Sequence, residues 1–241
     1  MSGRTFVIKD AYTQFVSLTI ICGHYGCGKT NFAINYAIDK ARSGRKVTLA
    51  DMDVVNPYFT SSEYSDVLKE NGINVISPTF ASTNLDIPAL PAAMHSLFDT
   101  DDDVVIDAGG DDAGATVLGR FSDMIRKKGY EMLYVTNMYR PFTSNAEDSA
   151  GLLKEIENVC RLKATAVVNN SHLKGLTTPA TITDSLAYAK AVSEKAGIPL
   201  MFTVVPERLL SELPKEEYFY PADVYVKTIW ERANDESDHQ R

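Results

Sequence analysis

Short apolar runs alternate with longer segments of helical pattern along most of the chain. Seven runs rich in β-branched and other apolar residues are typical of buried strands, and they span residues 16–22, 47–50, 73–76, 104–106, 132–136, 166–168 and 200–205. Four segments of helical length lie between them, at residues 29–42, 115–128, 144–160 and 183–195. This alternation predicts an α/β fold in which helices flank a mainly parallel sheet of about seven strands.

The pattern shows no internal boundary. The 241 residues contain no repeat, no low-complexity linker and no shift in composition, and α/β folds often reach about 250 residues as one unit. We therefore expect residues 1–241 to form a single domain. Residues 77–91 contain three prolines and are the least regular stretch, so a long loop or lid is expected there.

The amino-acid composition and the net charge indicate which kinds of partner the chain can bind. Hydrophobic residues make up 44% of the chain and charged residues 23%, which is typical of a folded globular protein. The 24 basic and 32 acidic side chains give a net charge of −8. A chain this acidic lacks the broad positive field that attracts nucleic acid or anionic lipid, so we expect neither as a partner. Any bound polyanion must be held by a few well-placed donors.

The three cysteines form no closely spaced pair. Cys22, Cys27 and Cys160 are an odd number without a CxxC pattern, which fits a reducing compartment and argues against an iron–sulfur cluster or a zinc site. No apolar run has the length of a signal peptide core or a membrane span, so we expect a cytoplasmic protein. The acidic residues 231–238 also argue against a basic amphipathic membrane anchor.

One motif carries specific chemistry. Residues 23–30 match the phosphate-binding pattern GxxxxGK[ST], directly after a predicted strand and at the start of a predicted helix. Its glycines let the backbone approach phosphate, Lys29 adds charge at the β- and γ-phosphates, and Thr30 is placed to bind Mg²⁺. The predicted phosphate-binding residues are Gly23, His24, Tyr25, Gly26, Cys27, Gly28, Lys29, Thr30 and Asn31. Cys27 is interpreted as a small filling side chain, with a redox-sensitive thiol as the alternative.

Two predicted strands end in acidic residues, as a phosphate loop with Mg²⁺ requires. Asp51 and Asp53 follow the strand at residues 47–50, and Asp107 follows the strand at residues 104–106. Asp107 begins a DxxG pattern, in which it would bind Mg²⁺ through water while the Gly110 amide senses the γ-phosphate. The alternatives are a helix cap for Asp107 and turn-forming roles for the other two.

Together these motifs resemble the MinD/ParA/CobQ–CobB nucleotide-binding family of SIMIBI-class P-loop ATPases, over roughly residues 17–208. The resemblance implies a Rossmann-like P-loop NTPase fold with the Walker B strand beside the P-loop strand. It implies binding of ATP with Mg²⁺, and slow hydrolysis that switches partner affinity or dimerisation. Asp53 matches the acid that orients the attacking water and, with Lys29, forms the expected catalytic pair. Asp51 matches an acid near Mg²⁺ and Thr30.

Two later segments extend the resemblance to the base. Asn170 lies where this family recognises adenine, with Asn169 as its neighbour, and an amide pairs well with the adenine edge. An asparagine in a turn is the alternative. Pro206 and Glu207 match the segment whose backbone packs on the base. The N-K-x-D pattern of GTP-binding proteins is absent, which favours ATP.

The chain also departs from the family. Many members carry a signature lysine as the second P-loop residue, which reaches the nucleotide of a dimer partner, whereas this chain has His24. A neutral imidazole does not replace a permanent cation, so the sequence does not predict whether two copies form a dimer around ATP, as members with the lysine do. Asp111 and Asp112 either cap the following helix or contact Mg²⁺ or a partner.

Three functions remain. We expect a regulatory or assembly ATPase that uses ATP with Mg²⁺ to grip or release a protein partner or a second copy. The alternative is an ATP-dependent ligase or kinase for a small molecule, of the dethiobiotin synthetase or CobQ–CobB type, with residues 56–59 and 77–91 forming its pocket. A third is a nucleotide-binding protein with little hydrolysis.

Overall fold

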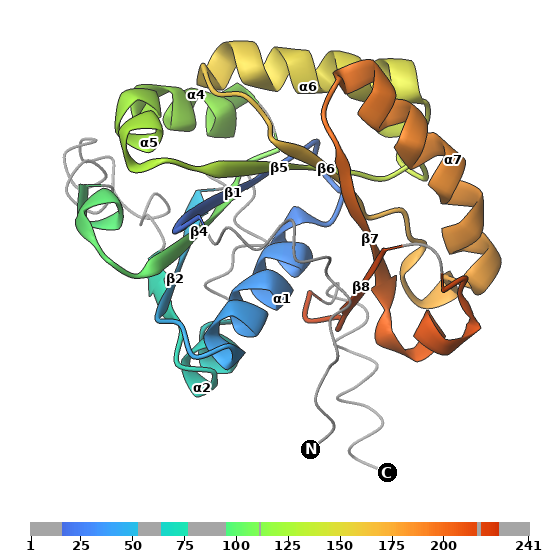
Figure 1. Ribbon diagram of the computed structural model, residues 1–241, viewed down its shortest axis with the longest axis horizontal. Helices are drawn as coiled ribbons and strands as arrows, with labels where there is room; N and C mark the ends of the chain where they lie inside the picture. The colour runs from blue at the N-terminus through green and yellow to red at the C-terminus, as the bar shows by residue number, and fades with distance from the viewer. Residues whose placement is uncertain (1–15, 53–63, 77–94, 111, 216–217, 227–241) are drawn as a thin grey trace, which may run out of the picture.

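A computed structural model describes residues 16–52, 64–76, 95–110, 112–215 and 218–226. Eight parallel strands form one sheet in the order β3-β2-β4-β1-β5-β6-β7-β8 (Figure 1). The strands are β1 (Leu18–Cys22), β2 (Val47–Met52), β3 (Asn74–Ile76), β4 (Asp103–Ala108), β5 (Glu131–Thr136), β6 (Ala166–Asn169), β7 (Leu200–Pro206) and β8 (Phe219–Ala222). The predicted parallel α/β sheet is therefore confirmed, and β4 lies beside β1 as the resemblance implied.

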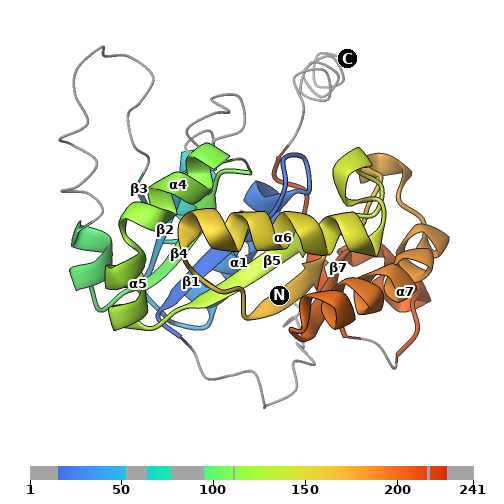
Figure 2. The same cartoon turned by 90° about the horizontal axis from the view of Figure 1, so that it is seen from above.

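Helices cover both faces of this sheet (Figures 1 and 2). Helices α1 (Lys29–Arg42) and α2 (Ser65–Glu70) pack on one face, whereas the opposite face carries α4 (Asp112–Arg120), α5 (Ser122–Lys128), α6 (Ala146–Cys160) and α7 (Pro179–Ala196). The described residues of β1, β2 and β4 are buried throughout, because apolar side chains leave both faces of each strand. Two apolar cores result, one on each side of the sheet.

Several elements differ from the sequence-based expectation, and helix α2 was not predicted at all. Strand β8 was not predicted, because its four residues include Pro221, and proline is tolerated in sheets mainly at an edge such as this one. The helix expected at residues 115–128 is two helices, α4 and α5, that meet at Phe121, whose ring lies 6.1 Å from that of Phe98. Helix α7 begins earlier than expected, at Pro179, because Thr178 forms a capping box with Thr181.

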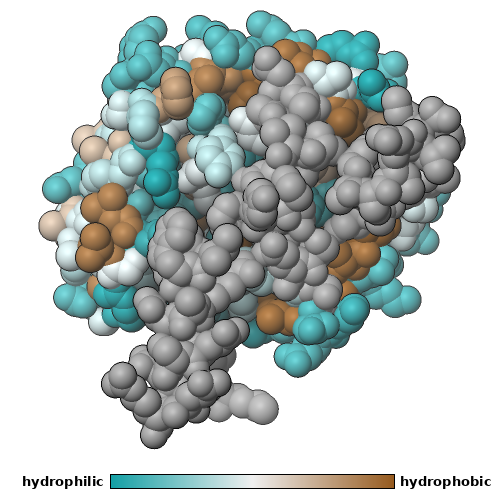
Figure 3. Space-filling model, turned by 180° about the vertical axis from the view of Figure 1, so that it is seen from behind, coloured by the Kyte–Doolittle hydropathy of each residue, from teal (hydrophilic) through white to brown (hydrophobic). Residues whose placement is uncertain are grey.

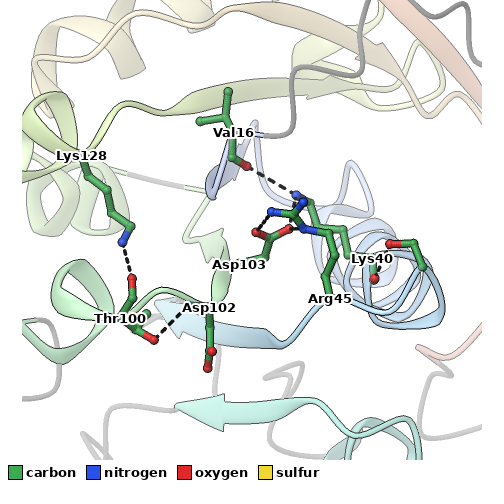
Figure 4. Close-up of polar contacts among 8 residues, drawn as sticks. Val16, Lys40, Arg45, Thr100, Asp102, Asp103 and Lys128 are labelled. Atoms are coloured by element: carbon green, nitrogen blue, oxygen red, sulfur yellow. Dashed lines mark hydrogen bonds and ion pairs between the residues drawn. The ribbon is translucent and has the colours of Figure 1, made fainter.

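A buried ion pair holds the sheet together at the end opposite the P-loop (Figure 4). Asp103, the first residue of β4, accepts hydrogen bonds from Arg45 and, at 2.9 Å, from Lys40 of α1. The side chains of Asp103 and Lys40 are 1% and 6% exposed, so each charge depends on the other for stabilisation. This contact fixes α1, and with it the P-loop, against the Walker B strand.

The segment after β8 is tied to the first turns of α1. Asn31 Oδ1 accepts the backbone N–H groups of Tyr225 and Val226 at 2.8 and 3.1 Å. Asn35 Oδ1 accepts the N–H of Asp223 at 2.9 Å, and both asparagine amides donate to the Asp223 carbonyl at 2.9 Å. Residues 223–226 therefore lie against the helix that begins at the phosphate loop.

Viewed from behind, exposed apolar residues form separate patches among hydrophilic ones, outside the area that grey atoms cover (Figure 3). None of the described helices combines the length and the apolar character that crossing a membrane requires.

Candidate nucleotide-binding site

The P-loop connects β1 to α1 and has the backbone that phosphate binding needs. Gly26 and Gly28 adopt left-handed φ angles of 77° and 83°, which only glycine adopts without strain. Gly28 caps α1 without a side-chain hydrogen bond, so the N–H groups of the first turn are open to an anion. Gly23 passes so close to β5 that an added methyl group would lie 2.2 Å from the Val135 carbonyl oxygen.

Lys29 lies under this loop. Lys29 is buried, at 6% exposure, and its Nζ donates a hydrogen bond to the His24 carbonyl oxygen at 3.3 Å. A methyl group added at Gly110 would lie 2.6 Å from both Lys29 Nζ and the backbone nitrogen of Tyr25. The segment that leaves β4 therefore passes close to the phosphate loop and to Lys29. The role of Gly110 toward the γ-phosphate stays a prediction.

The two described acidic residues of the predicted metal site lie next to each other. Asp51 of β2 is the register partner of Asp107 of β4, and Asp107 also pairs with Ile21 of β1. The two carboxylates are buried, at 2% and 1% exposure, and both belong to strands that end beside the P-loop. Carboxylate oxygens at the ends of β2 and β4, and the hydroxyl group of Thr30 at the start of α1, are hard oxygen donors of the type that Mg²⁺ prefers. Among the described residues, no three or more His, Cys, Asp or Glu side chains form a group that could hold a metal ion by themselves.

Some predicted site residues lie outside the described part of the chain. These are Asp53, the acid expected to orient water, Asp111, and the loops at residues 56–59 and 77–91. Asp112 is the first residue of α4.

The two asparagines after β6 have different surroundings. Asn169 is fully buried, where its Nδ2 donates to Ser185 and Thr203 and its Oδ1 accepts from Ser171, so its side chain is used within the fold. Asn170 instead faces the P-loop and donates from Nδ2 to the Cys27 carbonyl at 2.7 Å. None of the described residues donates to its Oδ1, which leaves an acceptor for the adenine amino group. Its predicted role in base binding stays a prediction.

The remaining predicted residues are placed as follows. Pro206 ends β7 and Glu207 begins the short helix η5 (Glu207–Glu212), so both lie at the same edge of the sheet as Asn170. Cys27 is fully buried, burial raises the pKa of its thiol, and its Sγ lies 3.7 Å from Thr143 Oγ1. The filling role therefore fits its position better than a reactive thiol. The side chain of Asn31 holds residues 223–226, which leaves its backbone amide for phosphate.

His24 is committed to local packing. Its Nδ1 donates to the Tyr25 carbonyl at 3.1 Å, and its ring lies 5.0 Å from the ring of Phe142. The second residue of the P-loop therefore has a side chain that packs beside the loop.

Two residues that the motifs did not indicate also contact the loop. Arg140, after β5, donates from Nε to the Gly26 carbonyl at 2.9 Å. A methyl group added at Gly28 would lie 3.2 Å from His172 Nε2. Burial, and then the charges of Arg140 and Lys174, lower the pKa of His172 to about 4. Neither residue belongs to a sequence motif with fixed spacing. Each follows a predicted strand, and the order of the strands in the sheet brings both to the P-loop.

The fold resembles several solved structures, although no family model and no curated protein matches the chain. The cell division protein FtsY of Thermotoga maritima shares 24% identity at a TM-score of 0.52, over 86% of this chain and 65% of that chain. The signal recognition particle 54 kDa protein of Aeropyrum pernix, in complex with GDP, shares 18% identity at 0.52, over 78% of this chain and 41% of that chain.

The fold is the α/β fold of P-loop nucleotide-binding proteins that these structures share. A nucleotide-binding protein of Archaeoglobus fulgidus in complex with ADP also shares it, with 18% identity and a TM-score of 0.51 over 81% of this chain and 84% of that chain. The chain spans less than two thirds of the length of the FtsY and signal recognition particle structures. At these identities the likeness concerns the fold.

Proposed function

We propose that the chain binds ATP with Mg²⁺ at residues 23–30, hydrolyses it slowly, and uses it to switch its affinity for a protein partner or a second copy, as in the MinD/ParA family. The observation that carries this proposal is the close approach of Gly110 to the P-loop, where a methyl group added to the glycine would lie 2.6 Å from Lys29 Nζ and from the Tyr25 backbone nitrogen. A γ-phosphate that binds Lys29 would lie close to Gly110, in the segment that follows β4. Binding and loss of that phosphate would therefore change the position of this segment and the surface next to the site.

The roles follow from placement. Lys29 is a buried ammonium group, and a phosphate oxygen offers it a stronger partner than the His24 carbonyl does. Thr30, Asp51 and Asp107 would hold Mg²⁺, which neutralises phosphate charge when bound. The Oδ1 atom of Asn170 would accept a hydrogen bond from the adenine amino group, and the backbone of Pro206 and Glu207 would pack on the base. Asp53 keeps its predicted role toward the attacking water.

Binding is tested by calorimetry with ATP, ADP and GTP on the full chain. We expect Lys29→Ala to lower affinity for ATP at least about tenfold, since it removes a charge-assisted contact. Lys195→Ala, at an exposed ion pair on α7, is the matched control and should leave affinity unchanged. Equal affinity of the Lys29→Ala variant and the native chain would overturn the proposal, and tighter binding of GTP than ATP would correct the nucleotide.

The switch role is tested by measuring the rate of ATP hydrolysis by the chain in the presence of an extract of the source cells. Dialysis first separates this extract into a retained protein fraction and a dialysable fraction of small molecules. Stimulation by the retained protein fraction, or by raising the concentration of the chain itself, is the expected result. Stimulation by the dialysable fraction alone would contradict it and indicate the ligase or kinase alternative, whose expected pocket lies outside the described residues.

A further inference from the structure

The loop after β5 brings a guanidinium group onto the P-loop. We propose that Arg140 is a further binding residue of the nucleotide site, which pairs with the phosphate chain from the β5 side of the loop. This inference rests on the proposed function. Its geometric basis is the 2.9 Å hydrogen bond from Arg140 Nε to the Gly26 carbonyl, in the middle of the phosphate-binding motif.

The site has a vacant role for such a cation. A polyphosphate carries several negative charges, so a single cation in the P-loop balances only part of them. Here the second P-loop residue is His24, whose Nδ1 proton is used by the Tyr25 carbonyl and whose ring packs 5.0 Å from Phe142. Within residues 23–30, Lys29 is the one permanent cation. A second must come from another part of the chain.

Arg140 has the chemistry for this role. A guanidinium group has five N–H donors in a planar fork that matches phosphate oxygens. The Nε donor is used by Gly26, and none of the described residues accepts a hydrogen bond from the two terminal amino groups. The Gly26 contact holds the side chain at the loop before a ligand arrives, which reduces the entropy lost on binding.

The positive charge of Arg140 affects two groups at the P-loop, His172 and Cys27. After burial, which is the larger cause, the positive charge of Arg140 helps to lower the pKa of His172. The same charge acts to lower the pKa of Cys27 against the larger effect of burial. These effects agree with the position of Arg140 beside the P-loop, which the hydrogen bond to the Gly26 carbonyl establishes.

The test compares Arg140→Gln and Arg140→Lys with the native chain in calorimetric titrations with ATP, ADP and AMP in the presence of Mg²⁺. Arg126→Gln is the matched control, because Arg126 of α5 also donates to a backbone carbonyl but lies away from the P-loop. We expect Arg140→Gln to weaken binding of ATP and ADP at least about tenfold and AMP less, and Arg140→Lys to keep part of the affinity.

Urea unfolding without nucleotide separates binding from a structural role. The inference holds if the unfolding midpoint of Arg140→Gln matches that of Arg126→Gln while its ATP affinity falls. It is overturned if ATP affinity stays at the control level, or if Arg140→Lys binds as weakly as Arg140→Gln and both variants unfold earlier. Loss of affinity in Lys29→Ala but not in Arg140→Gln leaves the proposed function standing and removes only this inference. Unchanged affinity in both variants removes both.

Discussion

Gly28 shows how much of the site depends on a missing side chain. Its φ of 83° is left-handed, and an added methyl group would lie 2.4 Å from Asn170 Nδ2. Gly44, which follows α1, has a similar φ of 88° but nothing within 4 Å of the same position. The pair therefore separates the cost of backbone conformation from the cost of crowding.

We expect Gly44→Ala to lower the free energy of unfolding by about 1 kcal/mol, the cost of a left-handed alanine. Gly28→Ala should cost about 1 kcal/mol more, since Asn170 must move and loses its hydrogen bond to the Cys27 carbonyl. Urea unfolding of the two variants measures the difference. Equal losses would show that Asn170 does not press on the loop.

His172 makes stability depend on pH. Its pKa is about 4 in the folded chain against an ordinary value of 6.5, mainly because of burial. Between these values the unfolded chain binds more protons than the folded one, so stability is fully present above about pH 6.5 and falls as pH drops toward 4. On lowering the pH from 7 to 4.5, His172 alone should remove about 2 kcal/mol.

We expect His172→Asn to remove this component, because asparagine stays neutral and its Oδ1 can replace Nδ1 as acceptor for the Lys174 N–H. Urea unfolding at pH 7 and 4.5 gives the measurement, with the exposed His95→Asn as control. A variant that loses as much stability in acid as the native chain would contradict the assignment.

Among the elements, β4 connects the two ends of the sheet. Asp103 at its start is buried with Lys40 and also pairs with the partly exposed Arg45, and Asp107 near its end is the register partner of Asp51. Movement of the strand along its axis would break contacts at both ends. The ion pair therefore helps to keep Asp107 level with the P-loop.

We expect Asp103→Asn to lower the free energy of unfolding by about 3 kcal/mol, because it leaves the buried ammonium group of Lys40 without its counter-charge. Glu147→Gln breaks the ion pair with Lys195 at the surface, where both side chains are largely solvated, and should have little effect. Chemical unfolding of both variants is the measurement. A small loss in Asp103→Asn would mean that water reaches Lys40.

At the scale of the whole molecule, the sequence predicts best what is local. The P-loop residues, the strand that precedes them and the helix that follows were all predicted, because their chemistry depends on neighbours in the chain. The hydrogen bonds between Asn31 and residues 223–226 join positions more than 190 residues apart and leave no periodic signal. Arg140 and His172 were missed for the same reason, since only the order β1-β5-β6 brings their loops to the P-loop.

The candidate site draws on β1, α1, β2, β4 and the loops after β5 and β6, so a ligand there stabilises contacts across the sheet. A ligand that binds only the folded chain adds about 2.7 kcal/mol of stability at 100 times its dissociation constant. We expect ATP with Mg²⁺ to raise the free energy of unfolding in this way, and ATP with EDTA to raise it less, because buried Asp51 and Asp107 repel phosphate in the absence of the metal.

Urea unfolding with fixed ATP, with and without Mg²⁺, measures this difference. Asp107→Asn should reduce it, since the variant removes the negative charge of one of the two buried carboxylates. Asp123→Asn, at an exposed position of α5, should keep it. The comparison is made relative to each variant without nucleotide, so that any loss of intrinsic stability cancels. Equal stabilisation of the native chain with Mg²⁺ and with EDTA would show that the paired carboxylates do not hold a metal, whatever the affinity for ATP.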